Sequence, residues 1–356
     1  MRKVRVAVIG CGGIAQLVHI PSLKRLEGEG LVELVAVCDL YEEVARAVAS
    51  KFGVERWRTS HVELLEREDV DAVVNATWHA AHARVTIDAA RAGKHVFVEK
   101  PMAVTIEECR EMVEACRRAG VKLMVGFMKR FDPSLRWVRG LARGGSLGDV
   151  FLVNSWYYDT VVHMEYVRGL AGEFIRPRAP PPREAWAFTK DRLLSLLLTH
   201  GVHHADLLRW VGGEVRAVTA SYAEGSGESY VLTAILEYEG GATGYFQLAG
   251  PVADDWDEGL VVKGTEGSAR VYIRFPYFKW RSEAVAYLKG RGEYVSKLFP
   301  CRDMYLEELR HFVECVASGG EPEPSGLDGL RAQELIYAMH RSVREGRRVE
   351  LSELRG

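Results

Sequence analysis

The segment that most constrains the fold is VRVAVIGCGGIA at residues 4–15, where an apolar strand leads directly into a glycine-rich loop. In a strand–loop–helix unit of the form GxGxxA, the first glycine permits a tight turn and the second removes a Cβ that would block a phosphate. The helix that follows offers free N–H groups to an anion. Glycine-rich turns of this kind also occur without a ligand, so the neighbouring sequence decides whether this loop binds phosphate or serves only as a turn. If the loop is functional, pyrophosphate binds at Gly10, Gly12, Gly13 and Ile14.

The end of the next strand favours the dinucleotide interpretation. Residues 32–38 are mostly apolar and lead to Asp39, whose carboxylate stands where it would accept hydrogen bonds from the ribose hydroxyls of adenosine. Leu40 and Tyr41 follow, so no cation at these positions awaits a 2′-phosphate. The sequence therefore predicts NAD as the cofactor in preference to NADP. Asp39 would also serve as the N-cap of the next helix, a role compatible with ribose binding.

Length and composition narrow the class of protein. A chain of 356 residues is too long for one comfortable core, which predicts two domains. A net charge of −2 with interspersed signs argues against a nucleic-acid partner. The first strand begins too early to leave room for a signal peptide, and no apolar stretch approaches the roughly 20 residues of a membrane span, so we expect a cytoplasmic protein.

Two residue types bear on the environment of the protein. The six cysteines form no CxxC pair and no zinc spacing, which is typical of reduced thiols. Side-chain amides are scarce, a depletion typical of heat-adapted, thermophilic proteins.

The N-terminal third alternates strand and helix with short connections. This order predicts right-handed crossovers and a doubly wound parallel sheet of the Rossmann type, the NAD-binding domain, over residues 1–125. The expected strands lie near residues 4–9, 32–38, 71–76, 95–98 and 121–127.

Residues 126–356 have longer strands joined by hairpin turns, as at Gly240-Gly241. They predict an α+β domain with a large, mostly antiparallel open sheet, which would bind substrate and mediate oligomerisation. The last helix could pack back on the first domain. Because a sheet face without helices tends to be covered by another subunit, we expect a homodimer or homotetramer. The proline-rich stretch from Arg176 to Pro182 predicts a loop over the cleft or an arm to a neighbouring subunit.

A charged pair, Glu99-Lys100, ends the strand at 95–98 and is followed by Pro101. Ligands of open parallel sheets bind at this carboxyl edge, so Lys100 would face the nicotinamide. Taken alone, the pair is also compatible with a solvated surface contact. Taken together with other stretches of the chain, however, this motif means that the sequence resembles the Gfo/Idh/MocA oxidoreductase family, whose signature in this strand is Glu-Lys-Pro. The further matching stretches are Ala76-Thr77 with His82, Val125-Gly126-Phe127 with Arg130-Phe131, Gly201 to Asp206 with Trp210, and residues 305–351.

The resemblance implies roles for individual residues. Lys100 would contact the substrate hydroxyl, and His203 would act as general acid/base. Thr77, His82, Glu99 and Lys100 would contact the cofactor, and Arg130 the substrate. Physical chemistry supports the roles of Lys100 and His203. An imidazole has a pKa near 6.5, close to working pH, and a lysine cation favours a developing alkoxide.

One position departs from the family pattern. The family usually has an aspartate four residues before the histidine, whereas this chain has Thr199. Threonine can bind substrate by a hydrogen bond but cannot stabilise an imidazolium by charge. Either another acid reaches in or the substrate set is unusual. Asp159 and His163 are candidate replacements, although a residue such as Asp159 is more often a solvated strand end.

The remaining histidines predict no metal site. His200 and His204 are one helical turn apart, but the chain has no HExxH motif and the cluster His200, His203, His204 spreads over different helix faces. His79, with Trp78, is expected to shape the nicotinamide pocket.

Three functions remain open at this point. The first is an NAD-dependent dehydrogenase acting on a hydroxyl or keto carbon of a sugar, inositol or related polyol. The second is an NAD-dependent glycoside hydrolase, and the third is a non-catalytic nucleotide-binding regulator. Retention of Lys100 and His203 argues against the third.

Overall fold

The computed structural model describes residues 2–161, 166, 169, 174–179 and 189–355, which form two compact units. Unit 1 comprises Met1–Phe127, Leu170–Lys190 and Tyr305–Leu330, and unit 2 comprises Met128–Gly169, Asp191–Met304 and Arg331–Gly356. The sequence predicts a single domain boundary, near residue 125. The structure also groups two later stretches, 170–190 and 305–330, with the N-terminal residues.

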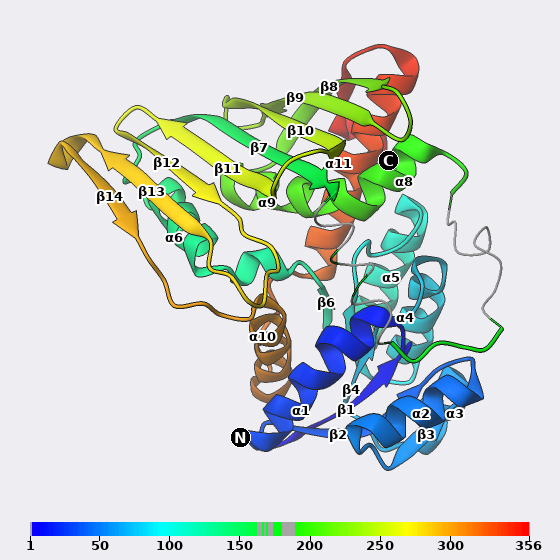
Figure 1. Ribbon diagram of the computed structural model, residues 1–356. Helices are drawn as coiled ribbons and strands as arrows, with labels where there is room; N and C mark the ends of the chain where they lie inside the picture. The colour runs from blue at the N-terminus through cyan, green and yellow to red at the C-terminus, as the bar shows by residue number, and fades with distance from the viewer. Residues whose placement is uncertain (1, 162–165, 167–168, 170–173, 180–188, 356) are drawn as a thin grey trace. The chain divides into compact units, whose positions relative to one another are not determined.

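Unit 1 is built on a six-stranded parallel sheet of order β3-β2-β1-β4-β5-β6 (Figure 1). The central strands are mostly apolar because both faces of the sheet are covered, and Val6, Ala7 and Val8 of β1 have no exposed surface. The chain reverses its direction of winding between β1 and β4, so the carboxyl ends of these strands form a switch point. The doubly wound Rossmann prediction is confirmed. The strands are β1 (Val4–Ile9), β2 (Val32–Cys38), β3 (Arg56–Arg58), β4 (Ala72–Asn75), β5 (His95–Val98) and β6 (Leu123–Val125).

The helices of unit 1 begin and end at the residues that local chemistry favours. A capping box of Thr105 and Glu108 starts α5, and Gly53 and Gly120, both with positive φ, end α2 and α5. The segments are η1 (Ala15–His19, a π-helical turn), α1 (Ile20–Gly28), α2 (Glu42–Phe52), α3 (His61–Arg67), η2 (His79–Ala81), α4 (His82–Arg91), α5 (Ile106–Ala119) and α10 (Met304–Ser318), of which Met304 belongs to unit 2.

Unit 2 is built on a nine-stranded sheet of order β14-β13-β12-β11-β7-β10-β9-β8-β15. Every pairing is antiparallel except that of β7 with β10, which confirms the mostly antiparallel prediction. The strands are β7 (Val150–Thr160), β8 (Val215–Glu224), β9 (Tyr230–Tyr238), β10 (Thr243–Val252), β11 (Asp257–Gly264), β12 (Gly267–Tyr272), β13 (Glu283–Leu288), β14 (Glu293–Lys297) and β15 (Val349–Glu350).

Helices α6 and α9 lie on the same side of this sheet, as Figure 1 shows, and pack against β12, β13 and β7. Along β7 the side chains alternate accordingly, with Val153, Ser155 and Tyr157 buried and the residues between them partly exposed. The helical segments are η3 (Met128–Phe131), α6 (Pro133–Arg143), α8 (Arg192–Leu196), η5 (Leu197–Gly201, a π-helical turn), α9 (Val202–Gly212), η6 (Lys289–Arg291), α11 (Gly326–Glu345, which begins in unit 1) and η7 (Leu351–Leu354). Among the described helices, none is long and apolar enough to cross a membrane.

Candidate active site

The glycine-rich loop leaves β1 at the switch point of the parallel sheet. Gly10 has φ +94°, and a Cβ there would lie 2.5 Å from the carbonyl oxygen of Ala76, so the turn requires glycine. At Gly12 the situation is different, because an added Cβ would meet no atom of the described residues within 4 Å. Protein packing therefore does not explain this glycine, whereas a phosphate lying outside the loop would. The first N–H groups of the following helix, which lack intrahelical partners, are available to such an anion.

Asp39 follows β2 and braces the loop. One carboxylate oxygen accepts the Cys11 backbone N–H at 2.9 Å, and the other accepts that of Tyr41 at 3.0 Å. A carboxylate has about four acceptor positions, so both oxygens keep lone pairs for ribose hydroxyls. The glycine loop, the helix that follows it and Asp39 thus fit a dinucleotide.

Asn75, the last residue of β4, organises the next loop. Its amide donates to the carbonyl oxygen of His82 at 3.0 Å, and its side-chain oxygen accepts the Thr77 hydroxyl at 2.7 Å. The ring nitrogens of the fully buried His82 contact the carbonyl oxygens of Pro101, at 2.9 Å, and Thr77, at 3.1 Å. The His82 ring therefore ties this loop to the one after β5. Contact of Thr77 and His82 with the cofactor stays a prediction.

The Glu-Lys-Pro motif ends β5, and its glutamate is the centre of a buried network. Glu99 Oε1 lies 2.7 Å from His19 Nε2, and Oε2 accepts the backbone N–H of Lys100 at 2.9 Å. Burial acts to raise the pKa of Glu99, but the hydrogen bond and attraction of His19 outweigh it, so that this pKa lies below its ordinary value. Burial also lowers the pKa of the Lys100 ammonium, against the opposing charge of Glu99. The motif therefore holds the backbone of Lys100 and tunes its charge.

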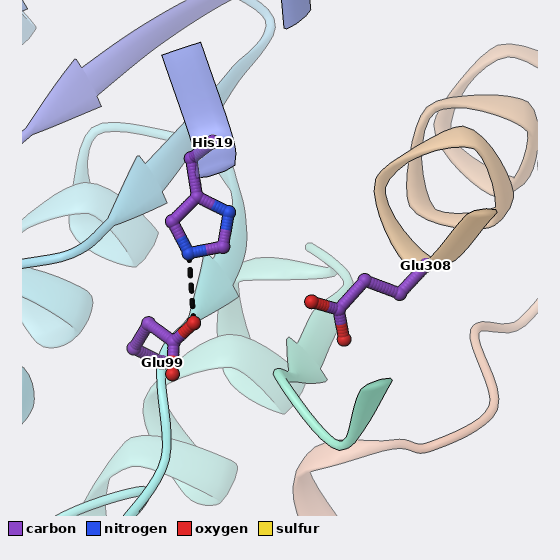
Figure 2. Close-up of side chains that lie close together, drawn as sticks. All are labelled: His19, Glu99 and Glu308. Atoms are coloured by element: carbon purple, nitrogen blue, oxygen red, sulfur yellow. Dashed lines mark hydrogen bonds and ion pairs between the residues drawn. The ribbon is translucent and has the colours of Figure 1, made fainter. Parts of the chain in front are cut away.

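A second carboxylate, that of Glu308 on α10, points toward this pair from the opposite side (Figure 2). The donor atoms of His19, Glu99 and Glu308 lie within 4.8 Å of one another, and all three residues are buried. Within the described ranges this is the one group of three whose donor set could hold a metal ion. In the structure His19 Nε2 is hydrogen-bonded to Glu99, so His19 acts as a buried support for the motif. The sequence analysis did not single out His19 or Glu308.

Unit 2 contributes the predicted catalytic histidine. His203 lies in the first turn of α9 and is 8% exposed, which leaves an edge accessible. Thr199 and His200 precede it on the π-helical turn η5 and are partly buried. Single π-helical turns inserted in longer helices occur frequently at functional sites. The His200 ring stacks on Tyr157 of β7, with ring centroids 5.3 Å apart.

His204, the neighbour of His203, faces the interior. Its Nε2 lies 2.8 Å from Glu258 Oε1, and its Nδ1 is hydrogen-bonded to Ser155. Glu258 also forms a salt bridge with Lys129 and accepts the Tyr277 hydroxyl at 3.0 Å. Burial and the charge of Lys129 lower the pKa of His204 well below its ordinary value, so this histidine is neutral. This network of Lys129, His204 and Glu258 holds α9 and η3 against β11. It was not predicted from the sequence.

The other predicted substrate residues occupy different environments. Arg130 is 2% exposed and forms a bidentate pair with Asp206, with Nε to Oδ2 at 2.8 Å and Nη2 to Oδ1 at 2.5 Å. Asp159 is partly buried near the end of β7, and His163 lies outside the described residues. Substrate binding by Arg130, Asp159 and Thr199 stays a prediction.

Comparisons with known proteins agree with this geometry. Residues 4–127 match an oxidoreductase family's NAD-binding Rossmann fold, and residues 139–351 match the C-terminal alpha/beta domain of the same family. Among curated proteins, the chain is 29% identical to the myo-inositol 2-dehydrogenase of Thermotoga maritima, over 99% of this chain and 100% of the relative.

Solved structures similar to this chain are also named as an oxidoreductase and a dehydrogenase. An aldose-aldose oxidoreductase from Caulobacter crescentus, complexed with glycerol, superposes with a TM-score of 0.80 at 27% identity, covering 98% of this chain and 100% of the other. The WlbA dehydrogenase from Bordetella pertussis, in complex with NADH and UDP-GlcNAcA, superposes with a TM-score of 0.74 at 26% identity over 98% and 99% of the two chains.

Proposed function

The chain belongs to the Gfo/Idh/MocA family of NAD-binding oxidoreductases, and from this premise we propose that it is a dehydrogenase that uses NAD to oxidise or reduce a hydroxyl or keto carbon of a sugar, inositol or related polyol. The observation that carries the proposal is the support of Lys100. Its backbone N–H is bound by Glu99, which is itself held by His19, at the carboxyl edge of β5. A lysine fixed in this way, with its pKa lowered by burial, suits a chemical role better than a solvated surface role.

The cofactor assignment follows from the loop and the acid. NAD supplies a nicotinamide that accepts or returns a hydride. Gly12 and the first turn of the helix after the loop would bind its pyrophosphate, and the remaining lone pairs of Asp39 would bind the adenosine ribose. The carboxylate would repel a 2′-phosphate, which favours NAD over NADP.

Lys100 and His203 would divide the work on the substrate oxygen. In the oxidation direction, the ammonium of Lys100 stabilises negative charge that develops on the oxygen. The imidazole of His203 takes the hydroxyl proton, and in the reverse direction it returns a proton to the alkoxide. Thr199 can offer a hydrogen bond to the substrate but no charge to the imidazolium. The protonation of His203 would therefore depend more on the positive charge of Lys100 than on Thr199.

The chemistry of the relatives supports the substrate class. They include an enzyme named for myo-inositol and one named for aldoses, both of which are polyhydroxylated rings or chains. The half-buried Thr199 and His200 offer hydrogen-bonding groups, which suit a sugar, and the buried Tyr157 stacks on His200 and supports it.

The test is a screen of inositols, sugars and their keto forms, with NAD and NADP in parallel and nicotinamide absorbance as the readout. We expect turnover with NAD for at least one polyol. His203→Ala should abolish turnover and leave NADH binding intact, and Lys100→Met should lower kcat by about 10²-fold or more. Wild-type-like turnover of His203→Ala would remove this residue from the mechanism. Cleavage of an aryl glycoside without net NADH formation would favour the hydrolase instead.

The face of the unit 2 sheet away from α6 and α9 carries exposed apolar side chains, including Ile235 at 57% and Tyr245 at 39% exposure. We propose that a second copy covers this face, giving a homodimer or homotetramer. Light scattering of Ile235→Lys should then show a smaller assembly than the wild type.

A further inference from the structure

A short segment far along the chain lies against the glycine-rich loop. Residues 174–179 follow β7 in sequence but belong to unit 1. A Cβ built on Gly13 would lie only 3.0 Å from the ring of Phe174, so the ring occupies the space that a side chain at position 13 would need. The absence of a side chain at Gly13 is therefore explained by Phe174, whereas none of the described residues fills the space beside Gly12.

Gln16, in the first turn after the loop, fastens this segment. Its side-chain oxygen accepts the Ile175 N–H at 3.0 Å, and its amide donates to the Ile175 carbonyl oxygen at 2.9 Å. The same amide donates to the Cys11 carbonyl oxygen at 2.8 Å. Because Gln16 is only 4% exposed, these bonds are shielded from water and fix both partners.

The segment then reaches the helix that follows Asp39. The Arg178 backbone N–H donates to the Glu43 carboxylate, in the first turn of α2, at 3.3 Å. Residues 174–178 thus run from Gly13 to the N-terminus of α2. These are the two places at which the proposed cofactor would present its pyrophosphate and its adenosine ribose.

We propose that residues Phe174–Arg178 form a retaining strap across the dinucleotide site, with Phe174 as a cofactor-contacting residue beside the pyrophosphate. This inference rests on the proposed NAD site and extends it to a part of the chain outside the Rossmann strands and helices. A dinucleotide bound from Gly12 to Asp39 leaves only when the Gln16–Ile175 hydrogen bonds open. Slow release of the cofactor follows, and slow release suits reactions that return the nicotinamide to its starting oxidation state on the enzyme.

The test measures cofactor release directly on the full chain. Enzyme loaded with NADH is mixed with excess ADP-ribose, and the loss of energy transfer from tryptophan to NADH gives the dissociation rate constant. Phe174→Ala should raise this rate constant by about tenfold or more, with a smaller change in the association rate constant. Phe151→Ala, which removes an exposed phenylalanine from β7, is the matched control and should leave release unchanged.

The outcomes separate the possible roles of the segment. If Phe174→Ala releases NADH at the wild-type rate, the strap does not retain the cofactor, and the proposal is overturned. A lower melting temperature of the cofactor-free variant with unchanged release would assign Phe174 a structural role only, which also overturns it. Because the assay needs no sugar, failure to find a polyol substrate would leave its result standing, and failure of wild-type enzyme to bind NADH would refute the proposed function itself.

Discussion

Replacing Glu258 by glutamine should destabilise unit 2 far more than removal of a surface charge. Glu258 and Lys129 are each 1% exposed and form a salt bridge, and Glu258 also binds His204 and Tyr277. Glutamine keeps the shape and much of the hydrogen bonding but removes the negative charge. The Lys129 ammonium is then left in the interior without its carboxylate.

The size of the effect follows from burial. Removal of one partner of a buried ion pair costs about 3–5 kcal/mol, because the desolvation of the remaining charge is no longer offset. An exposed pair is worth about 0–1 kcal/mol. Lys289–Glu266 is such a pair in the same unit, at 2.9 Å with side chains 61% and 52% exposed. Glu266→Gln is therefore the matched control for Glu258→Gln.

Urea unfolding followed by tryptophan fluorescence measures the free energy of unfolding of each variant. We expect a loss of about 3–5 kcal/mol for Glu258→Gln and at most about 1 kcal/mol for Glu266→Gln. The double variant Lys129→Met with Glu258→Gln should recover part of the loss, because neither charge is then buried. Equal effects of Glu258→Gln and Glu266→Gln, or no recovery in the double variant, would refute the assignment of a buried charge network.

Three further predictions address the cofactor site and the acid stability. Gly12→Ala should weaken NADH binding and leave the melting temperature nearly unchanged, whereas Gly10→Ala should lower the melting temperature, because a Cβ at Gly10 meets protein atoms and one at Gly12 meets none of the described residues within 4 Å. Fluorescence titration measures the binding and calorimetry the melting temperature, and equal melting shifts for the two variants would contradict this distinction. Asp39→Ala should reduce the preference for NAD over NADP in binding titrations, and an unchanged ratio of dissociation constants would exclude its contact with the ribose. Burial acts to raise the pKa of Asp71, but hydrogen bonds from Arg5 and Arg2 outweigh it and lower this pKa to about 2. Since the unfolded pKa is about 4, its stabilising contribution is present above that pH and is lost as the pH falls from about 4 to about 2; Asp71→Asn should flatten the measured stability profile in this window, and an unaltered profile would count against the Arg5–Asp71 contact.

Much of unit 1 could be predicted from local sequence. The strands at Val4–Ile9, Val32–Cys38 and His95–Val98 lie at the expected residues, because doubly buried parallel strands are continuous apolar runs with clear ends. The capping box of Thr105 and Glu108 is likewise a local feature, since it depends on residues three apart. The three-residue β3 (Arg56–Arg58) was missed, because a short run of Arg-Trp-Arg has no periodicity that distinguishes it from a loop.

The supports of the site could not be predicted in the same way. His19 with Glu99, Lys129 with Glu258, and Gln16 with Ile175 each join residues that are distant in sequence. Such pairs depend on the tertiary path of the chain and leave no local pattern. The excursion expected at 176–182, as a loop over the cleft or an arm to a neighbouring subunit, stays a prediction. Its described part, up to Ala179, includes residues of the proposed strap, and Pro180–Pro182 lie outside the described residues. The π-helical turns η1 and η5 were not expected either, because their sequences are ordinary for helices.

If this chain moves a hydride between a polyol carbon and a nicotinamide, with Lys100 and His203 acting on the oxygen, an isotope label on that carbon follows the hydride. The most direct measurement uses the polyol found in the screen, deuterated at its carbinol carbons, in a single turnover with NAD, followed by mass spectrometry of the extracted cofactor. We predict that the cofactor gains one deuterium atom with wild-type enzyme and none with His203→Ala. Oxidised product with no deuterium in the cofactor would rule out direct hydride transfer to the nicotinamide.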